Sequence, residues 1–273
     1  MDGAVKDALN ASAGFPLNVF EFNQRAWDQL VTSGNRWTVP VSAEDIAKAR
    51  RGDWRLVLTP SLPVPDAWFP TLEGCRVLCL ASGGGQQGPI LAAAGAVVTV
   101  FDASEKQLAQ DRLVAEREGL SLTTVQGDMA DLSCFDDESF DFIFHPCSNC
   151  FAESIRPVWQ EAYRVLCPGG SIVSGFVKPV HGLFDPELEK QGIFQLKFQM
   201  PHSDLKVSEE DRSEWFGADA PIEFVHSLDD QLGGQLDAGF LIAGFYEDDW
   251  GGNEPIDQFI KSFIAVRSIK PLT

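Results

Sequence analysis

The sequence lacks any hydrophobic run of the roughly eighteen residues that a membrane-spanning helix requires. Its first residues, MDGAVKDALNASAGF, also lack the basic and apolar regions of a secretory signal peptide. We therefore expect a soluble, cytoplasmic protein with no membrane partner. The 273 residues, 44% of them hydrophobic, are enough to bury a sizeable core.

Positive charge is scarce. Lys and Arg number 21 against 40 Asp and Glu, which gives a formal net charge of −19. Affinity for nucleic acids depends largely on Lys and Arg contacts to phosphates, and a field of this sign repels polyanions. We therefore expect a small-molecule substrate, and nucleic acid is disfavoured as a partner.

Cysteine is sparse and irregularly spaced, with six residues and a single CxxC pair at Cys147 and Cys150. A lone CxxC is a weak indication of zinc, although His145 lies two residues upstream, and a metal or redox site there stays an alternative. We expect reduced thiols and no metal. The sequence also lacks HExxH, a phosphate-binding lysine loop and a Ser-His-Asp order, which disfavours hydrolases and nucleotide triphosphatases.

What is present from residue 76 onward is a regular alternation of strands and helices. Short apolar runs predict strands at residues 76–81, 97–102, 122–128, 140–146 and 169–177, and helices are expected between them, including 104–119 and 154–166. Two further strands, within 239–250 and 259–269, follow a helix expected at 226–238. This order predicts an α/β fold with a mostly parallel seven-stranded sheet whose final strand is antiparallel.

The flanking segments differ in character from this core. Residues 18–32 show helical spacing of large apolar side chains, and Ser42 begins a second short helix that runs to about Arg51. The stretch 179–221 is irregular and rich in aromatic and charged residues. We expect residues 1–70 to form an N-terminal helical cap or lid over a domain spanning 71–273, with 179–221 as an insertion on the substrate side.

The glycine-rich stretch SGGGQQG follows the first predicted strand and precedes a helix. Glycine permits close approach of a ligand to the backbone, and the free N–H groups of the helix face that ligand. Gly83, Gly84, Gly85 and Gly88 supply this loop. A glycine turn between a strand and a helix is also common without any ligand.

Two carboxylates narrow the interpretation to a nucleoside. Asp102 ends the second strand about twenty residues after the loop, where it would accept hydrogen bonds from ribose hydroxyls, although its position also suits a helix N-cap. Asp128 closes the third strand, and Met129 beside it would pack against a base. Ligands of open α/β sheets bind outside the carboxyl ends of the strands.

In order and spacing, VLCLASGGG, VTVFDAS, VQGDMADL, FDDESFDFIF and EAYRVLCPGGSIVSGF resemble the motifs of class I S-adenosylmethionine-dependent methyltransferases. The resemblance covers residues 70–178 well. It implies a Rossmann-like three-layer fold and an enzyme that transfers a methyl group from S-adenosylmethionine, leaving S-adenosylhomocysteine.

The resemblance also implies roles for particular residues. The methionine and ribose part of the cofactor would meet the loop at Ala81, Ser82, Gly83 and Gly85. Asp102, with Ala103 next to it, would hold the ribose, while Asp128 would bind the adenine amino group and Met129 the ring face. The backbone carbonyl near His145 would face the amino group of the cofactor.

Two residues depart from the family pattern. Cys79 stands where the family usually has an acid, which questions the hold on the cofactor's amine, and Ala81 stands where it usually has glycine. Two alternatives remain open at this point. One is a non-catalytic S-adenosylmethionine sensor, and the other is an NAD(P)-dependent oxidoreductase, because Gly83, Gly85 and Gly88 also fit a G-x-G-x-x-G pattern.

Methyl transfer chiefly requires alignment of a nucleophile and exclusion of water, with a general base in some cases. His145 is a candidate base and His181 a second one, although a lone histidine is often structural and many such transferases need no base. Aromatic and basic residues of the two flanking segments are candidates to close over the site, with ordinary packing as the alternative: Trp27, Arg36, Trp37, Phe184, Phe194 and Phe198.

Overall fold

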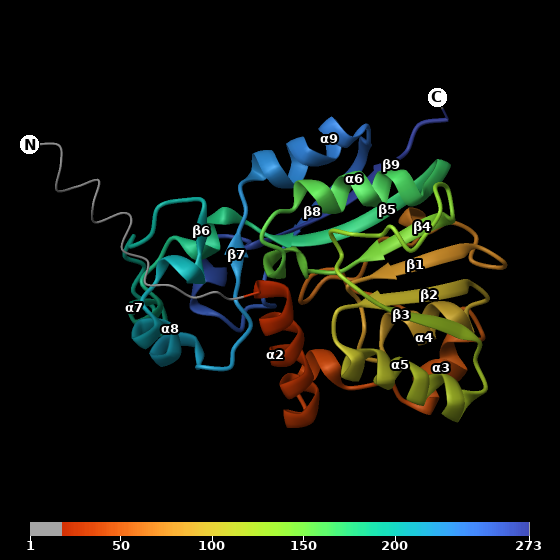
Figure 1. Ribbon diagram of the computed structural model, residues 1–273, viewed down its shortest axis with the longest axis horizontal. Coiled ribbons are helices and arrows are strands. Elements are labelled where there is room, and N and C mark those ends of the chain that lie inside the picture. Colours follow the sequence, from red (N-terminus) through yellow and green to blue (C-terminus); the bar gives the residue numbers. More distant parts are fainter. Residues whose placement is uncertain (1–17, 273) are drawn as a thin grey trace, which may run out of the picture.

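A computed structural model describes residues 18–272, and within this range a seven-stranded sheet forms the centre of the molecule. The strand order is β3-β2-β1-β4-β5-β9-β8. Only β9 runs against its neighbours, since it pairs antiparallel with both β5 and β8 (Figure 1). The predicted sheet is thus confirmed. Its strands are β1 (Arg76–Leu80), β2 (Val97–Asp102), β3 (Leu122–Gln126), β4 (Phe140–His145), β5 (Leu166–Val177), β8 (Leu241–Asp248) and β9 (Phe263–Ile269).

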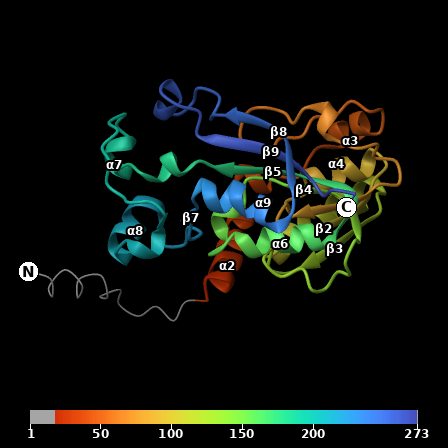
Figure 2. The ribbon, with the colours of Figure 1, turned by 90° about the horizontal axis from the view of Figure 1, so that it is seen from above.

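Helices cover both faces of the sheet and complete three layers, as predicted. In Figures 1 and 2, α6 and α9 lie over one face, and α3, α4 and α5 lie over the other. The helix α2 lies beside α5, at the edge of the second layer. These helices are α2 (Val19–Ser33), α3 (Ala43–Ala49), α4 (Gln87–Ala93), α5 (Glu105–Glu118), α6 (Arg156–Val165) and α9 (Gly234–Ala238).

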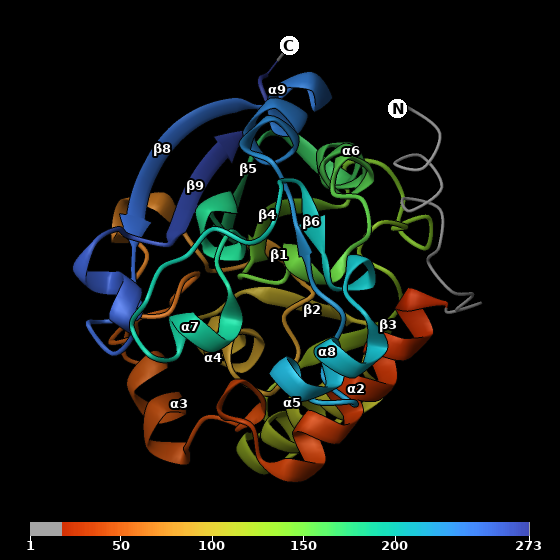
Figure 3. The ribbon, with the colours of Figure 1, turned by 90° about the vertical axis from the view of Figure 1, so that its left-hand side faces the viewer.

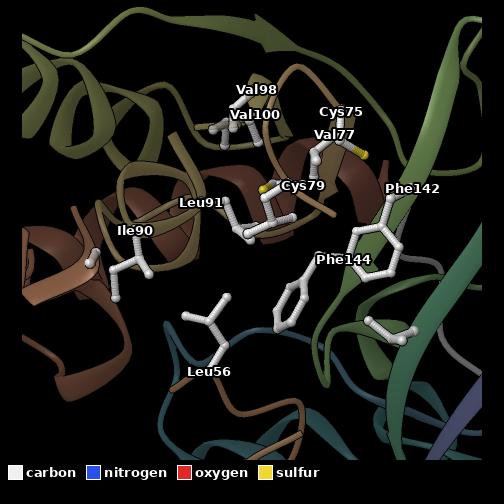
Figure 4. Packing of buried hydrophobic residues seen from close by; sticks show 14 of the residues in the cluster. Leu56, Cys75, Val77, Cys79, Ile90, Leu91, Val98, Val100, Phe142 and Phe144 are labelled. Atoms are coloured by element: carbon white, nitrogen blue, oxygen red, sulfur yellow. The ribbon is translucent and has the colours of Figure 1, made fainter. Parts of the chain in front are cut away.

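Alternation along β1 explains why the sheet is buried on both faces. Val77 and Cys79 pack with Leu91 of α4, whereas Leu78 and Leu80 belong to the cluster around α6. Figure 4 shows Cys79 beside Leu91 in the first of these clusters. Successive side chains of a strand point to opposite faces, so a strand covered on both sides reads as a continuous apolar run.

The predicted helix starts agree with their capping residues. Ser42 and Asp45 form a capping box at α3, each accepting a hydrogen bond from the other's backbone N–H. The helix expected at 226–238 is present but irregular, because a π-helical turn at Asp229–Gly233 precedes α9. Gly234 lies so close to Trp159 that a Cβ there would be 2.8 Å from its ring, which explains the second of the paired glycines.

Strand β5 begins three residues earlier than the sequence predicted. The Pro-Gly-Gly segment was expected to form a turn before the strand, but Leu166 already pairs with Phe140, and the register then shifts before Phe142 pairs with Ser171. The segment is therefore an irregularity within the strand. Such bulges accommodate residues that a regular ladder would reject.

The segment between β5 and α9 lies at the end of the sheet where β1, β4 and β5 finish, on the same side as α2 (Figure 3). It contains α7 (Pro186–Glu189), α8 (Glu209–Phe216) and a two-stranded pair, β6 (His202–Ser203) with β7 (Phe224–Val225). The N-terminal segment is not separate from the core, because Ile46, Leu56 and Leu58 are buried in the cluster that includes β1. Among residues 18–272, no helix is long and apolar enough to cross a membrane.

Candidate active site

A cavity of about 710 Å³ opens at the carboxyl ends of the central strands. We divide its lining into two parts by sequence position. The glycine-loop half comprises the lining residues between 81 and 130, and the remote half comprises those within 18–60 and 146–263. Pockets of roughly 300–1,000 Å³ are typical of small-molecule sites. This is the end of the sheet at which open α/β proteins bind their ligands.

The loop after β1 is fixed to the end of β2 by a carboxylate. The Gly83 N–H donates to Asp102 Oδ2 at 2.8 Å, and the Ser104 N–H donates to Oδ1 at 2.9 Å. A Cβ on Gly83 would lie 2.8 Å from Cβ of Gln107, so a larger residue would push the loop into the cavity. Glycine at this position therefore preserves the space beside Asp102.

Asp102 faces the cavity from deep within the protein. Burial raises the pKa of Asp102 to about 6, against the hydrogen bonds from Ser104 and Gly83 that favour the charged form. The N-cap of α5 is Ser104, whose hydroxyl accepts from the Gln107 N–H. The interpretation of Asp102 as the helix cap is therefore wrong, and its carboxylate is available to a ligand.

The end of β3 brings its predicted residues to the same wall. Asp128 and Met129 line the cavity, as do Ala81, Ser82 and Ala103. One oxygen of Asp128 accepts from the Ala130 N–H at 2.9 Å, and Met129 packs against the cluster around α6. The predicted residues at the ends of three successive strands thus lie together in the cavity wall.

Gly85 is the exception in the loop, because it does not line the cavity. It has φ +72° and faces the backbone of Gln110, where a Cβ would lie 2.8 Å from the carbonyl oxygen. Behind the loop, the Gly84 N–H donates to the buried Asp111 at 3.0 Å. We therefore correct the prediction for Gly85: the residue permits the turn and the packing of the loop on α5, and it lies outside the cavity lining.

His145 does not lie in the cavity lining either. The ring is fully buried, with Nδ1 2.8 Å from the Leu80 carbonyl oxygen and Nε2 hydrogen-bonded to the side chain of Asn149. Burial lowers the pKa of His145. With both nitrogens engaged inside the protein, the ring does not reach an acceptor. The prediction of His145 as a general base is therefore corrected: its ring supports the loop after β4.

The second candidate base and the CxxC pair do border the cavity. His181 lines it, and burial lowers the pKa of its ring. Cys147 and Cys150 are free thiols whose pKa values are raised, chiefly by burial, so neither is a thiolate at neutral pH. Within residues 18–272, no three His, Cys, Asp or Glu side chains are grouped to hold a metal ion.

The residues expected to close over the site divide into two groups. Trp27 and Trp37 line the cavity, and the Arg36 guanidinium lies 4.2 Å from the Trp37 ring centroid and 5.6 Å from that of Trp250, a further lining residue. The three phenylalanines of the insertion do not line it. Phe184 and Phe194 pack on each other, and Phe198 stacks on His202.

Sequence reasoning missed Glu223, which lines the remote half. It also missed Asn23, a buried residue of α2. The Asn23 side chain forms two hydrogen bonds with the backbone of Ile222: Nδ2 donates to the carbonyl oxygen at 3.0 Å, and Oδ1 accepts from the N–H at 2.7 Å. No local pattern marks either residue. Glu223 is one of 40 acidic residues, and its place in the cavity depends on a contact 199 residues away in the sequence.

Comparison with known proteins identifies the family of this chain. Residues 78–174 match the methyltransferase domain family. The uncharacterized methyltransferase YbaJ of Bacillus subtilis (strain 168) is 53% identical over 249 residues, which are 91% of this chain and 97% of that protein.

The chain belongs to the class I S-adenosylmethionine-dependent methyltransferases.

A solved structure agrees with this methyltransferase at the level of the fold, and a further sequence relative matches a shorter stretch. The S-adenosylmethionine-dependent methyltransferase from Mesorhizobium loti is 19% identical, with a TM-score of 0.58 over 74% of this chain and 94% of that one. The sterol 24-C-methyltransferase ERG6B of Gibberella zeae is 39% identical over 100 residues, 36% of this chain and 26% of that protein.

The two departures from the family pattern lie in and directly after β1 of the methyltransferase. Cys79 is fully buried in the cluster with Leu91, so its thiol does not replace an acid at the cavity (Figure 4). Ala81 lies in the left-handed region at φ +46°, which explains why glycine is usual there. Membership of this enzyme family favours S-adenosylmethionine over a dinucleotide and a transferase over a sensor.

Proposed function

We propose that this methyltransferase transfers a methyl group from S-adenosylmethionine to a small acceptor molecule bound in the same cavity. The observation that carries the proposal is the continuity of the cavity, whose lining joins the glycine-loop half to the remote half without interruption. When bound, the cofactor supplies a methyl carbon already activated by its sulfonium. The protein then has to align the acceptor and exclude water.

The glycine-loop half fits an adenosine. The Asp102 carboxylate is available to ribose hydroxyls, and Gly83 leaves the space beside it open. We assign Ala81, Ser82 and Gly83 to the methionine and ribose part, Ala103 to the ribose side, Asp128 to the adenine amino group and Met129 to its ring. We assign no cofactor contact to His145, because the residue is not part of the cavity lining.

We assign the covering of the site to the N-terminal segment and the segment after β5. The contacts of Trp27 and Trp37 with the cavity support the first assignment, and the position of Glu223 supports the second. Within residues 1–70, the part proposed as a cap is α2 and the following turn with Trp37, because residues from Ile46 onward share the main core. Residues 1–17 lie outside the described part of the chain.

Binding of S-adenosylhomocysteine by titration calorimetry tests the proposal. We expect S-adenosylmethionine and S-adenosylhomocysteine both to bind and to raise the melting temperature, since a ligand that binds only the folded state stabilises it. NAD should do neither. Stabilisation by NAD alone would overturn the cofactor assignment.

A second experiment separates an enzyme from a sensor. The protein is incubated with S-adenosylmethionine labelled in its methyl group and with metabolite extracts, and the small-molecule fraction is searched for label. We expect label in at least one small molecule. Cofactor binding without any transferred label across broad extracts would favour a sensor.

A further inference from the structure

The remote half of the cavity is aromatic, and the Arg36 guanidinium lies against the rings of two of its residues, Trp37 and Trp250, without lining the cavity itself. Among the described residues that line the whole cavity, none is Lys or Arg, whereas Glu153 and Glu223 both belong to the remote half. A buried anion without a counter-charge is costly, so an acceptor with a carboxylate or phosphate is disfavoured there. Aromatic faces attract cations. The aromatic side chains of the remote half are Phe20, Trp27, Trp37, Phe151, Trp250 and Phe263.

Glu223 is held firmly in this wall by its backbone. Its N–H donates to Asp204 Oδ2 at 2.8 Å, and its carbonyl accepts from the Asp204 N–H at 3.0 Å. The preceding residue, Ile222, is held on both sides by Asn23. Glu223 is thus tied to Asp204 within the segment after β5, directly after the residue that Asn23 of α2 binds. Its position is fixed although it lies outside any regular element.

The Glu223 side chain is exposed, and it borders the cavity. Within residues 18–272, its carboxylate has neither a hydrogen bond nor an ion pair. Desolvation by the surrounding side chains, and secondarily the charge of Asp204, raise the pKa of Glu223 to about 7. A bound cation would relieve both effects.

Glu223 also faces the loop that follows β4. After burial, its charge is the next contribution to the raised pKa values of Cys147 and Cys150. Since the thiols stay protonated, they offer no charge of their own. The other titratable side chains of the remote half are Glu153 and His181.

We propose that the acceptor is an amine with an apolar body, and that Glu223 binds its nitrogen and takes a proton from it. The proposal rests on the proposed function, because the methyl donor occupies the glycine-loop half. The apolar body lies against the aromatic side chains, and the ammonium group pairs with the carboxylate.

The step balances as follows in atoms and electrons. The ammonium nitrogen gives one proton to the Glu223 carboxylate, and the lone pair that is freed forms a bond to the methyl carbon. The carbon–sulfur bond breaks, and its electron pair stays on sulfur. The products are a methylated ammonium, the protonated Glu223 and the neutral thioether of the cofactor product.

The test uses the full chain saturated with S-adenosylhomocysteine and matched sets of probes. Each set consists of a phenylalkyl amine and the alcohol and carboxylate with the same carbon chain, over several chain lengths. Calorimetry measures binding, and mass spectrometry measures methylation in a parallel reaction with S-adenosylmethionine. We expect an amine to bind at least about tenfold more tightly than its matched partners, and amines to be the methylated probes. If no amine outperforms its matched carboxylate and alcohol, the proposal is overturned.

The Glu223→Gln variant keeps the shape of the side chain and removes its charge, and Glu214→Gln on α8, outside the cavity lining, is the matched control. We expect Glu223→Gln to lose the amine preference and to lower kcat/KM by roughly 100-fold or more. Glu214→Gln should match the wild type. Both should bind S-adenosylhomocysteine normally, which also shows that they are folded. Loss of cofactor binding by the wild type itself would instead contradict the proposed function.

The pH profile separates Glu223 from His181. Because the pKa of Glu223 is raised to about 7, its charge is lost as the pH falls through that value, and amine binding should weaken with it. This dependence should disappear in Glu223→Gln and persist in His181→Gln. The opposite pattern would assign the proton transfer to His181 and overturn the role of Glu223.

Discussion

The glycine-loop half of the cavity is lined by residues 81 to 130, whereas the remote half draws on segments as far apart as Asn18 and Phe263. In the glycine-loop half, the lining residues lie at or shortly after the ends of the parallel strands β1, β2 and β3. In the remote half, α2, the segment at residues 57–60, the loop after β4 and the segments after β5 meet only in the folded molecule. One half is a local structure repeated three times, and the other depends on long-range packing.

The difference teaches where specificity is built in this enzyme. In our proposal, the half that receives the cofactor presents two carboxylates at strand ends, Asp102 and Asp128. The half proposed for the acceptor is assembled from side chains such as Trp27, Trp250 and Glu223, which come from segments outside the run of parallel strands. Each half should therefore respond to mutation separately.

The largest effect is expected for Asp102→Ala. The change removes the acceptor for the Gly83 N–H at 2.8 Å and leaves ribose hydroxyls without a partner. Affinity for S-adenosylhomocysteine should fall by about 1–3 kcal/mol, which is roughly 5- to 150-fold. Titration calorimetry measures it, with the exposed Asp219→Ala as control. An unchanged affinity would show that Asp102 does not hold the ribose.

Asn23→Ala tests the remote half. Its side chain makes three hydrogen bonds to the backbone of Phe151 and Ile222, and the loss should lower the free energy of unfolding by about 1–2 kcal/mol. Because these bonds position Glu223, acceptor turnover should fall further than cofactor affinity. Urea denaturation, turnover and calorimetry measure the three quantities. An equal loss of cofactor affinity and turnover would contradict the separation of the two halves.

The fold and the glycine-loop half were predictable because local patterns determine them. The apolar run Val77 to Leu80, the glycines after it and Asp102 at the next strand end lie within thirty residues of each other. The order of parallel strands then brings their ends together without further information. The failure at Gly85 is one of detail, since sequence does not tell which glycine faces a ligand and which faces α5.

The remote half was predictable only in part: Trp27, Trp37 and His181 line it as expected, but other positions depend on long-range packing. His145 stood at a promising strand end, but its burial and its bond to Asn149 depend on packing that no local pattern records. Conversely, Glu223 looks like any surface acid until Asn23 and Asp204 fix its backbone against the cavity. Side-chain direction in irregular segments is set by contacts distant in sequence.

An effect spread over several pH units is expected from Asp111 behind the glycine loop. Burial raises its pKa to about 8, against an unfolded value of about 4. The folded state thus holds the proton more tightly, so this stabilisation is full below about pH 4 and is lost as the pH rises to about 8. Asp102 and Glu223, with pKa values of about 6 and 7, act in the same direction.

Asp111→Asn keeps an oxygen that accepts from the Gly84 N–H and removes the titration. Its melting temperature should therefore decline less between pH 5 and pH 8 than that of the wild type, while the exposed Asp136→Asn should follow the wild type. Thermal unfolding at a series of pH values measures the decline of the melting temperature in each protein. A steeper decline in Asp111→Asn would mean that Asp111 is charged in the folded protein.

The smallest effect is expected at Ala81, where the two halves meet the end of β1. At φ +46° an alanine costs about 1–2 kcal/mol, and glycine relieves this cost but loses about 0.4–1 kcal/mol through the freedom of the unfolded chain. Ala81→Gly should therefore raise the free energy of unfolding by about 0–1.6 kcal/mol. Ala109→Gly, at an exposed position within α5, should lower it by about 1 kcal/mol. Since urea denaturation compares the same chemical change in both variants, their opposite signs isolate the backbone strain. Destabilisation of both by similar amounts would show that the Ala81 methyl group packs favourably, and that this chain keeps alanine at the cavity for contact and not in spite of strain.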